Sequence, residues 1–274
     1  MTFYVSGVDI GSTTAKCVII DDKKKIVGKS LAPVGVKIVE DAEKSFIKAL
    51  EDAKLERDQV KFITGTGYGR FKVHFGQAIV TEISCHAKGA QFLFPETQTV
   101  LDIGGQDTKA IRIKDGEIID FAMNDKCSAG TGRFLDVCAD ALGFEIQEIG
   151  DLSLKGDKPV KISSTCTVFA ESEVINQVSR GKKPENILAG MHLSIARRSV
   201  SLIRRVGIDP EITFTGGVSR NKGMVISLER VLDYKVNVSP LSQHLGAAGA
   251  ALFALERVLD PNSDKIVDKE LLVK

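Results

Sequence analysis

A strand–glycine–strand pattern that occurs twice constrains this chain more than any other feature. VDIGSTTAKCVIID at 8–21 and LDIGGQDTKAIRIK at 101–114 align without a gap. Two hairpins could share apolar strands and a glycine by chance, but an acid, a glycine and a lysine at the same three positions are too specific for that. An internal repeat of this kind predicts two similar domains, each built on the same unit. The matched pairs are Asp9 with Asp102, Gly11 with Gly104, and Lys16 with Lys109.

The segments around the two copies predict an α/β fold. Each copy predicts a β-hairpin, and a third strand is expected after each, at 25–32 and at 117–123. Further strands are expected at 60–67 and 212–217, each running into a glycine turn. Apolar residues at helical spacing predict helices at about 40–55, 81–94, 131–142, 168–180, 184–206, 221–233 and 243–259.

The length of 274 residues also favours two domains, because it exceeds the commonest size of a single one. We expect a first domain at 1–95, completed by a C-terminal helix at about 243–274. The second domain is expected at 96–242.

Composition argues against several classes of partner. A net charge of +1 argues against a nucleic-acid binder or a protein of anionic membrane surfaces. The N-terminus lacks the basic segment and long apolar core of a signal peptide. The apolar stretch 247–255 ends at Glu256, short of the ~20 residues that a membrane span needs. Five cysteines, an odd number, suggest a reducing compartment, so we expect a cytoplasmic protein. From the charge and the short apolar stretch we expect no nucleic-acid or membrane partner.

The two glycine turns are candidate phosphate-binding sites, because a glycine after a strand lets backbone N–H groups approach an anion closely. Gly11 is followed by three hydroxyl donors and by Lys16, which could supply a positive charge. The hydroxyl donors are Ser12, Thr13 and Thr14. In the second copy the turn is formed by Gly104, Gly105 and Gln106. Two such turns could hold a polyphosphate between the domains.

The acids that end the two strands are candidates for holding a metal. Mg²⁺ typically uses one or two carboxylates together with phosphate oxygens, and Asp9 and Asp102 could supply them. A third turn, TGGVSRN at 215–221, could place the backbone of Gly216 and Gly217 against a base or a ribose.

Two better-known phosphate motifs are excluded. VGKS at 27–30 resembles the end of a P-loop, but the earlier glycine that a P-loop requires would fall at Lys23. GTGYG at 65–69 and GTGRFL at 130–135 both fail the pattern G-x-G-x-x-G. The chain therefore supports neither a P-loop nor a Rossmann dinucleotide site.

The three turns together carry a resemblance. DIGSTTAK, DIGGQDTK and FTGGVSRN resemble the first phosphate, second phosphate and adenosine motifs of the superfamily that contains actin, sugar kinases and heat-shock chaperone ATPases. The resemblance covers most of the chain, in the expected order. It implies two RNase H-like domains around an interdomain cleft for Mg-ATP, with Gly216, Gly217 and Val218 at the adenosine.

The five cysteines fall into two groups. A lone cysteine is more often a small buried apolar residue than a ligand, and we assign that role to Cys17, Cys85 and Cys138. Cys127 and Cys166 each follow a small polar run and precede a predicted helix, whose N-terminus would favour a thiolate. One chain supplies only these two ligands, so a two-fold homodimer would complete a four-thiolate site. Their spacing leaves open whether they are ligands or structural cysteines, and whether a bound metal would be a [4Fe–4S] cluster or zinc.

The residues around the two cysteines favour the [4Fe–4S] cluster. NDKCSAGTGRFLDV at 124–137 and SSTCTVFAESEV at 163–174, together with DIGGQDTK, closely resemble the activator ATPases of 2-hydroxyacyl-CoA dehydratases and their relatives, including benzoyl-CoA reductase ATPase subunits and reductases of double-cubane-cluster proteins. The resemblance implies that Cys127 and Cys166 bind one [4Fe–4S] cluster shared by a homodimer. It also implies that Gln243 faces the adenosine.

We therefore predict ATP-driven electron transfer. A ferredoxin or flavodoxin would supply the electron, and an iron–sulfur dehydratase or reductase would accept it. Asp9 and Asp102 would act on Mg²⁺ and water, and Gln106 and Asp107 are candidates for ordering the attacking water. The alternatives are a small-molecule kinase with the same ATPase fold and a nucleotide-regulated assembly protein resembling actin. The kinase would leave Cys127 and Cys166 unexplained. The sequence does not identify the electron acceptor.

Overall fold

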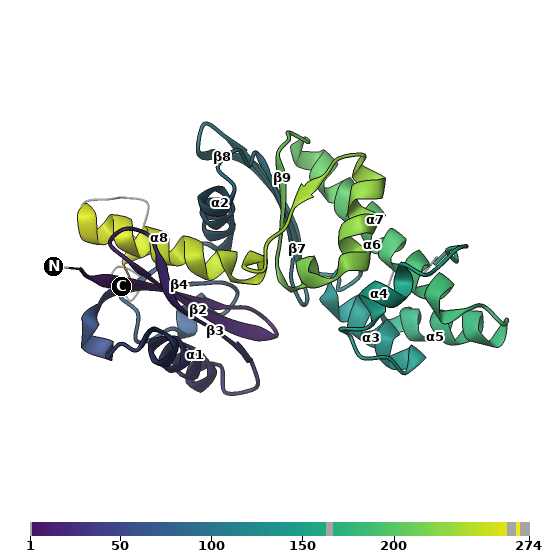
Figure 1. Ribbon diagram of the computed structural model, residues 1–274, viewed down its shortest axis with the longest axis horizontal. Coiled ribbons are helices and arrows are strands. Elements are labelled where there is room, and N and C mark those ends of the chain that lie inside the picture. Colours follow the sequence, from purple (N-terminus) through teal and green to yellow (C-terminus); the bar gives the residue numbers. More distant parts are fainter. Residues whose placement is uncertain (1, 163–166, 262–266, 269–274) are drawn as a thin grey trace. The chain divides into compact units, whose positions relative to one another are not determined.

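The computed structural model describes residues 2–162, 167–261 and 267–268. The chain divides into two units (Figure 1). Unit 1 contains residues 1–95 and 244–274, and unit 2 contains residues 96–243. The first unit is therefore built from both ends of the sequence.

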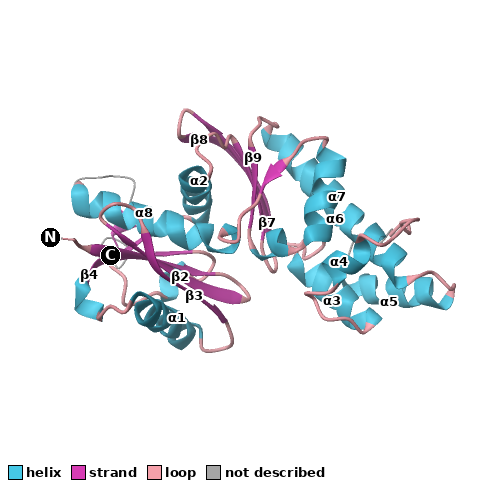
Figure 2. Cartoon of the chain, viewed as in Figure 1, coloured by secondary structure: helices cyan, strands magenta, loops and turns pink. Residues whose placement is uncertain are grey.

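A mixed sheet forms the centre of unit 1 (Figure 2). Its strands are β1 (Tyr4–Ile10), β2 (Thr14–Asp21), β3 (Ile26–Pro33), β4 (Val60–Thr66), β5 (Ala78–Ile79) and β11 (Val267–Asp268), in the order β11-β5-β4-β1-β2-β3. The strands β1, β2 and β3 form an antiparallel meander, and β4 pairs with β1 in parallel.

The helices of unit 1 bury both faces of its meander. The unit contains α1 (Ile38–Ala53), α2 (Glu82–Leu93) and α8 (Leu245–Leu259), with 3₁₀ turns η1 (Arg57–Gln59) and η2 (Arg70–Lys72). Val8 on β1 and Cys17 on β2 share a core with Phe46 of α1. The alternate residues of these strands, such as Val5 and Val18, point to the other face of the sheet and share a second core with α8. Because a strand exposes alternate residues to opposite faces, burial on both sides makes β1 and β2 apolar almost throughout.

Unit 2 repeats the same arrangement. Its strands are β6 (Thr99–Ile103), β7 (Thr108–Lys114), β8 (Glu117–Asn124), β9 (Ile212–Thr215) and β10 (Val236–Asn237), in the order β10-β9-β6-β7-β8. Its helices are α3 (Gly132–Leu142), α4 (Ile149–Ser153), α5 (Thr167–Ser179), α6 (Pro184–Val206) and α7 (Lys222–Leu232), with the 3₁₀ turn η3 (Gly217–Arg220). A further 3₁₀ turn, η4 (Ser242–His244), spans the boundary where the chain returns to unit 1. The strand β9 pairs with β6 in parallel, as β4 pairs with β1.

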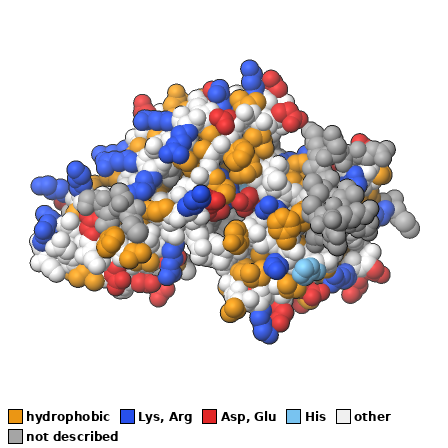
Figure 3. Space-filling view, turned by 180° about the vertical axis from the view of Figure 1, so that it is seen from behind, with side chains coloured by type: hydrophobic (Ala, Val, Ile, Leu, Met, Phe, Trp, Pro, Cys, Tyr) orange, Lys and Arg blue, Asp and Glu red, His pale blue; other side chains and the backbone are white. Residues whose placement is uncertain are grey.

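The observed elements agree with the α/β fold predicted from the repeat. The predicted strands and helices are present, with bounds that shift by a few residues at most. The sequence did not predict β5, β10 or β11, each of which has two residues, or the five-residue helix α4. Figure 3 shows side chains of both charges spread over one face of the molecule, as a net charge of +1 suggests. No helix among the described residues is long and apolar enough to cross a membrane.

The contact between β1 and α8 is close because Gly7 has no side chain. A Cβ atom at this position would overlap the carbonyl oxygen of Ala247 and the amide nitrogen of Ala251. Both obstacles are backbone atoms of α8, so neither can rotate away. The helix from the C-terminal part of the chain therefore packs directly on the first strand.

We predict that Gly7→Ala lowers the free energy of unfolding by about 3 kcal/mol, because overpacking against backbone forces the helix away from the strand. Thermal unfolding of the purified variant, followed by circular dichroism, measures the effect. Gly35→Ala is the matched control, since a Cβ there would lie 3.7 Å from its nearest neighbour, Oδ2 of Asp41. Equal melting temperatures for the two variants would contradict the close packing of α8 on β1.

Candidate active site

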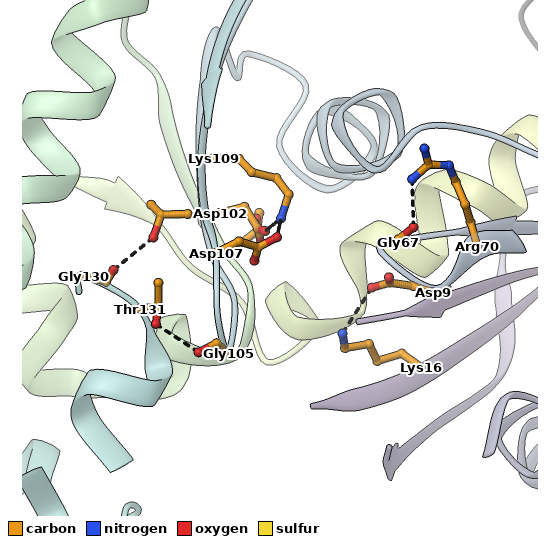
Figure 4. Close-up of polar contacts among 12 residues, drawn as sticks. Asp9, Lys16, Gly67, Arg70, Asp102, Gly105, Asp107, Lys109, Gly130 and Thr131 are labelled. Atoms are coloured by element: carbon orange, nitrogen blue, oxygen red, sulfur yellow. Dashed lines mark hydrogen bonds and ion pairs between the residues drawn. The ribbon is translucent and has the colours of Figure 1, made fainter. Parts of the chain in front are cut away.

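Asp9 lies near the end of β1 and is almost completely buried. Its cross-strand partner on β2 is Lys16, and the Lys16 Nζ lies 3.3 Å from Asp9 Oδ2 (Figure 4). The turn between the two strands is closed by the Gly11 N–H, which donates to the Thr14 carbonyl at 3.0 Å. A carboxylate is thus held at the end of a strand, next to a turn whose Ser12 and Thr13 are exposed.

Glycines surround the Asp9 carboxylate. Gly67, just after β4, has φ +87°, and a Cβ atom on it would overlap Asp9 Oδ1. A Cβ atom on Gly246 would lie 3.0 Å from Asp9 Oδ2 and 2.9 Å from Nε2 of His86, which is also buried. The positive φ and the lack of space each require glycine at position 67. Arg70 donates a hydrogen bond to the Gly67 carbonyl at 3.2 Å and so fixes this turn (Figure 4).

The second copy of the repeat has the same geometry in unit 2. Asp102 on β6 faces Lys109 on β7, with the Lys109 Nζ 3.2 Å from Asp102 Oδ2 (Figure 4). Lys109 also contacts Asp107 Oδ2 at 2.6 Å. The Thr215 hydroxyl donates to Asp102 Oδ1 at 2.8 Å. The Gly104 N–H closes the turn by donating to the Asp107 carbonyl at 3.0 Å, as Gly11 does in unit 1.

The repeat extends to a third position in each unit that sequence reasoning did not pair. Gly67 follows β4 and Gly216 follows β9, and their φ angles are +87° and +85°. A Cβ atom on Gly216 would lie 2.7 Å from Asp102 Oδ1, so each acid has a glycine against the same oxygen. The signal was present in the sequence, because Thr66 precedes Gly67 as Thr215 precedes Gly216.

The predicted adenosine residues lie together in unit 2. The Gly216 N–H donates to the Ser242 carbonyl at 3.2 Å, which joins η3 to η4. A Cβ atom on Gly217 would lie 3.4 Å from Nε2 of Gln243. The Oε1 atom of Gln243 accepts a hydrogen bond from Arg220 at 3.2 Å. Val218 is buried behind this group, and Gln106 is exposed on its own turn.

Hydrogen bonds connect the glycine turn of unit 2 to the start of α3. The N–H groups of Gly132 and Arg133 donate to the carbonyls of Gly104 and Gly105, at 2.9 and 2.8 Å. The Thr131 hydroxyl lies 3.0 Å from the Gly105 carbonyl (Figure 4). It also lies 2.7 Å from the Ser128 carbonyl. A displacement of the turn therefore reaches the segment that contains Cys127.

Cys127 is exposed in the segment between β8 and α3. As the sequence predicted, it precedes a helix: α3 begins at Gly132 and its N-cap is Thr131. The segment that contains Cys127 is held by Asn124, whose Nδ2 donates to the Cys127 carbonyl at 2.7 Å.

The second predicted cluster ligand, Cys166, lies outside the described residues. Within residues 2–162, 167–261 and 267–268, no group of three or more histidine, cysteine or acidic side chains could hold a metal ion. The part of the chain that the structure describes thus contributes one exposed thiol, Cys127, to the predicted site.

The other cysteines are structural. Cys17, Cys85 and Cys138 are buried. Burial raises the pKa of Cys17 to about 12, although the Ser6 hydroxyl at 3.1 Å from its Sγ acts in the opposite direction. Burial raises the pKa of Cys138 to about 12 and also raises that of Cys85. Since the thiolate is the reactive form, these three residues are inert in the folded protein.

We predict that iodoacetamide labels Cys127 in metal-free folded protein at about pH 8 and leaves Cys17, Cys85 and Cys138 unmodified. A thiol with a pKa of about 12 is only ~10⁻⁴ ionised at that pH, and burial blocks access as well. Mass spectrometry of tryptic peptides measures the rates. Labelling in guanidinium is the control, because all cysteines should then react. Rapid labelling of Cys138 before unfolding would show that its site opens.

Comparison with known proteins identifies close relatives. The profile described as the BadF/BadG/BcrA/BcrD ATPase family matches residues 6–254. The chain is 46% identical over 258 residues to the (R)-2-hydroxyglutaryl-CoA dehydratase activating ATPase of Acidaminococcus fermentans, covering 94% of this chain and 99% of that one. It is 46% identical to the activator of lactoyl-CoA dehydratase of Anaerotignum propionicum, over 92% and 98% of the two chains.

Solved structures include another activator that is similar to this chain over nearly its whole length. The activator of the 2-hydroxyisocaproyl-CoA dehydratase from Clostridium difficile, with bound ADPNP, is 40% identical and has a TM-score of 0.90 over 94% of this chain and 97% of that chain. A ROK family glucokinase from Streptomyces griseus, at 16% identity and a TM-score of 0.56 over 92% and 99%, shares the fold alone. These likenesses confirm the predicted fold, that of the actin and sugar kinase ATPases.

Proposed function

Because the chain belongs to the BadF/BadG/BcrA/BcrD ATPase family, we propose that it is an activator that uses Mg-ATP to drive one-electron transfer to an iron–sulfur 2-hydroxyacyl-CoA dehydratase. The observation that carries the proposal is the hydrogen-bonded connection between a phosphate-type glycine turn and the Cys127 segment. The names of the relatives support the class of acceptor. A ferredoxin or flavodoxin would serve as the electron donor.

The paired acids would act on the nucleotide. Asp9 and Asp102 are the buried carboxylates at the two glycine turns, and they would hold Mg²⁺ through its water shell. Lys16 and Lys109 balance their charge before ATP arrives. The N–H groups and hydroxyls of 11–14 and the Gly104–Gly105 turn would bind the phosphates. Gln106, exposed on its turn, or Asp107, held by Lys109, would orient the attacking water.

The residues present are compatible with a cluster shared by two copies of the chain. Cys127 is exposed, so its thiol could bind a cluster that lies between two copies of the chain. With Cys166, each chain would supply two thiolates, and a homodimer would supply the four that a [4Fe–4S] cluster requires. When bound, that cluster supplies a one-electron donor of low potential. The chain's own part is to hold Cys127 through Asn124 and to move this segment with the nucleotide turn.

Coupling would follow from the contacts of Thr131. A change at Gly105 when the γ-phosphate leaves would alter the hydrogen bonds to Thr131 and Arg133 at the start of α3. Thr131 also contacts the Ser128 carbonyl, one residue from Cys127. The two nucleotide states would thus favour two positions of the cysteine segment, which is the differential binding that such a switch requires.

Anaerobic purification tests the assignment of the cluster. We predict a brown protein with about four irons per dimer. Cys127→Ala and Cys166→Ala should each remove the colour and the iron, whereas Cys138→Ala, a buried cysteine of the same unit, should keep both. Iron analysis and the visible absorption spectrum measure this. A colourless, metal-free protein that phosphorylates a small metabolite would instead identify a kinase.

Replacing Thr131 by valine tests the coupling. The hydroxyl that contacts Gly105 and Ser128 is lost while the shape of the side chain is kept, so ATP hydrolysis should stay within about threefold and ATP-dependent reduction of the dehydratase should fall at least about tenfold. Thr131→Ser is the control and should restore the coupling. The expected readout is the number of ATP molecules hydrolysed per electron delivered. An unchanged ratio in the valine variant would show that Thr131 does not transmit the nucleotide state.

A further inference from the structure

A pocket of about 340 Å³ lies beside Cys127 within unit 2. Its lining includes Asn124 at the end of β8, Cys127 itself, and one side of α6. The volume lies at the lower end of the range for small-molecule sites, about 300–1,000 Å³. The lining residues include two arginines and no carboxylate, so the pocket is positively charged.

The positive charge comes from one face of α6. Arg198 and Arg205, spaced i and i+7, both line the pocket, as helical periodicity requires of residues on one face. Arg198 is half-buried against the Gly130 turn, and neither arginine forms an ion pair with another residue of the described chain. Arg205 is exposed, as are the sequence neighbours Arg197 and Arg204, which do not line the pocket.

A buried hydroxyl in the same wall has no protein partner. Ser199 is 1% exposed, and its Oγ makes no hydrogen bond within the described residues. A buried hydroxyl without a partner costs about 1–3 kcal/mol, which a ligand that accepts its proton would recover. Ser199 lines the pocket together with the two arginines. The Ser199 hydroxyl is therefore independent evidence for a ligand with an acceptor oxygen.

We propose that this pocket binds the phosphate group of a small molecule. Two guanidinium groups match the charge of a phosphate dianion, and arginine binds phosphate oxygens through paired hydrogen bonds. The Ser199 hydroxyl supplies a further donor in the same lining. The phosphate comes either from inorganic phosphate and pyrophosphate or from a phosphate ester, and the size of the pocket accommodates both.

Occupancy of the pocket affects the position of Cys127. Asn124 Nδ2 donates to the Cys127 carbonyl at 2.7 Å and lies 3.4 Å from the Ala129 carbonyl. A ligand that contacts Asn124 on β8 and Arg198 on α6 holds the two residues that lie against the segment between β8 and α3. The phosphate site is thus placed to control the order of the segment that carries the exposed thiol.

Isothermal titration of the full chain tests the proposal, with saturating ADP present so that phosphate does not compete at the nucleotide turns. Inorganic phosphate, pyrophosphate and glycerol 3-phosphate are the probes. Arg198→Gln and Arg205→Gln should each weaken binding about tenfold or more, and Ser199→Ala about threefold. The matched controls Arg197→Gln and Arg204→Gln remove the same charge outside the pocket and should stay within about twofold.

The probes also separate the two sources of phosphate. Tighter binding of glycerol 3-phosphate assigns the site to a phosphate ester, and tighter binding of the inorganic probes assigns it to free phosphate. No binding of any probe at about 10 mM, or an equal loss in all four arginine variants, would overturn the site. The titration needs neither iron nor a redox partner, so its result does not depend on the proposed electron transfer.

Discussion

The architecture depends on a carboxylate held by a lysine across a hairpin. In unit 2 the pair is the more deeply buried, with Asp102 and Lys109 side chains each 3% exposed. A buried ion pair is costly to desolvate, and removal of one partner typically costs 3–5 kcal/mol because the other charge remains. The contact thus fixes the register of the two strands and holds a carboxyl group at the end of one. Unit 1 repeats this arrangement with Asp9 and Lys16.

The sequence predicted the repeated hairpins well because their signal is local. Each strand, turn and lysine lies within a short segment, and the register places Asp9 opposite Lys16 as the alignment of the copies suggests. The pairing of Gly67 with Gly216 was missed, because it depends on a strand that joins the sheet from far along the chain. The two-residue strands were missed because a period of two cannot be recognised in two residues.

The position of Cys127 shows another limit of sequence reasoning. The sequence correctly predicted that Cys127 precedes a helix, but it did not predict what holds the residues between Cys127 and the N-cap, Thr131. The intervening residues form a segment that is hydrogen-bonded to Asn124 on one side and to the Gly105 turn on the other. Tertiary hydrogen bonds therefore decide where the thiol lies, and periodicity contains no information about them.

The dependence of unit 1 on α8 determines the order in which the chain can fold during synthesis. Strands β1 to β4 leave the ribosome first, but the helix that covers one face of their sheet follows only after all of unit 2. The face of the sheet that packs on α8 therefore stays exposed, including Val5, Val18 and Ile20. Unit 2 is a continuous segment and can complete its own core during that time. The N-terminal segment 1–95 thus becomes native last, and its uncovered sheet is the surface that a chaperone would protect.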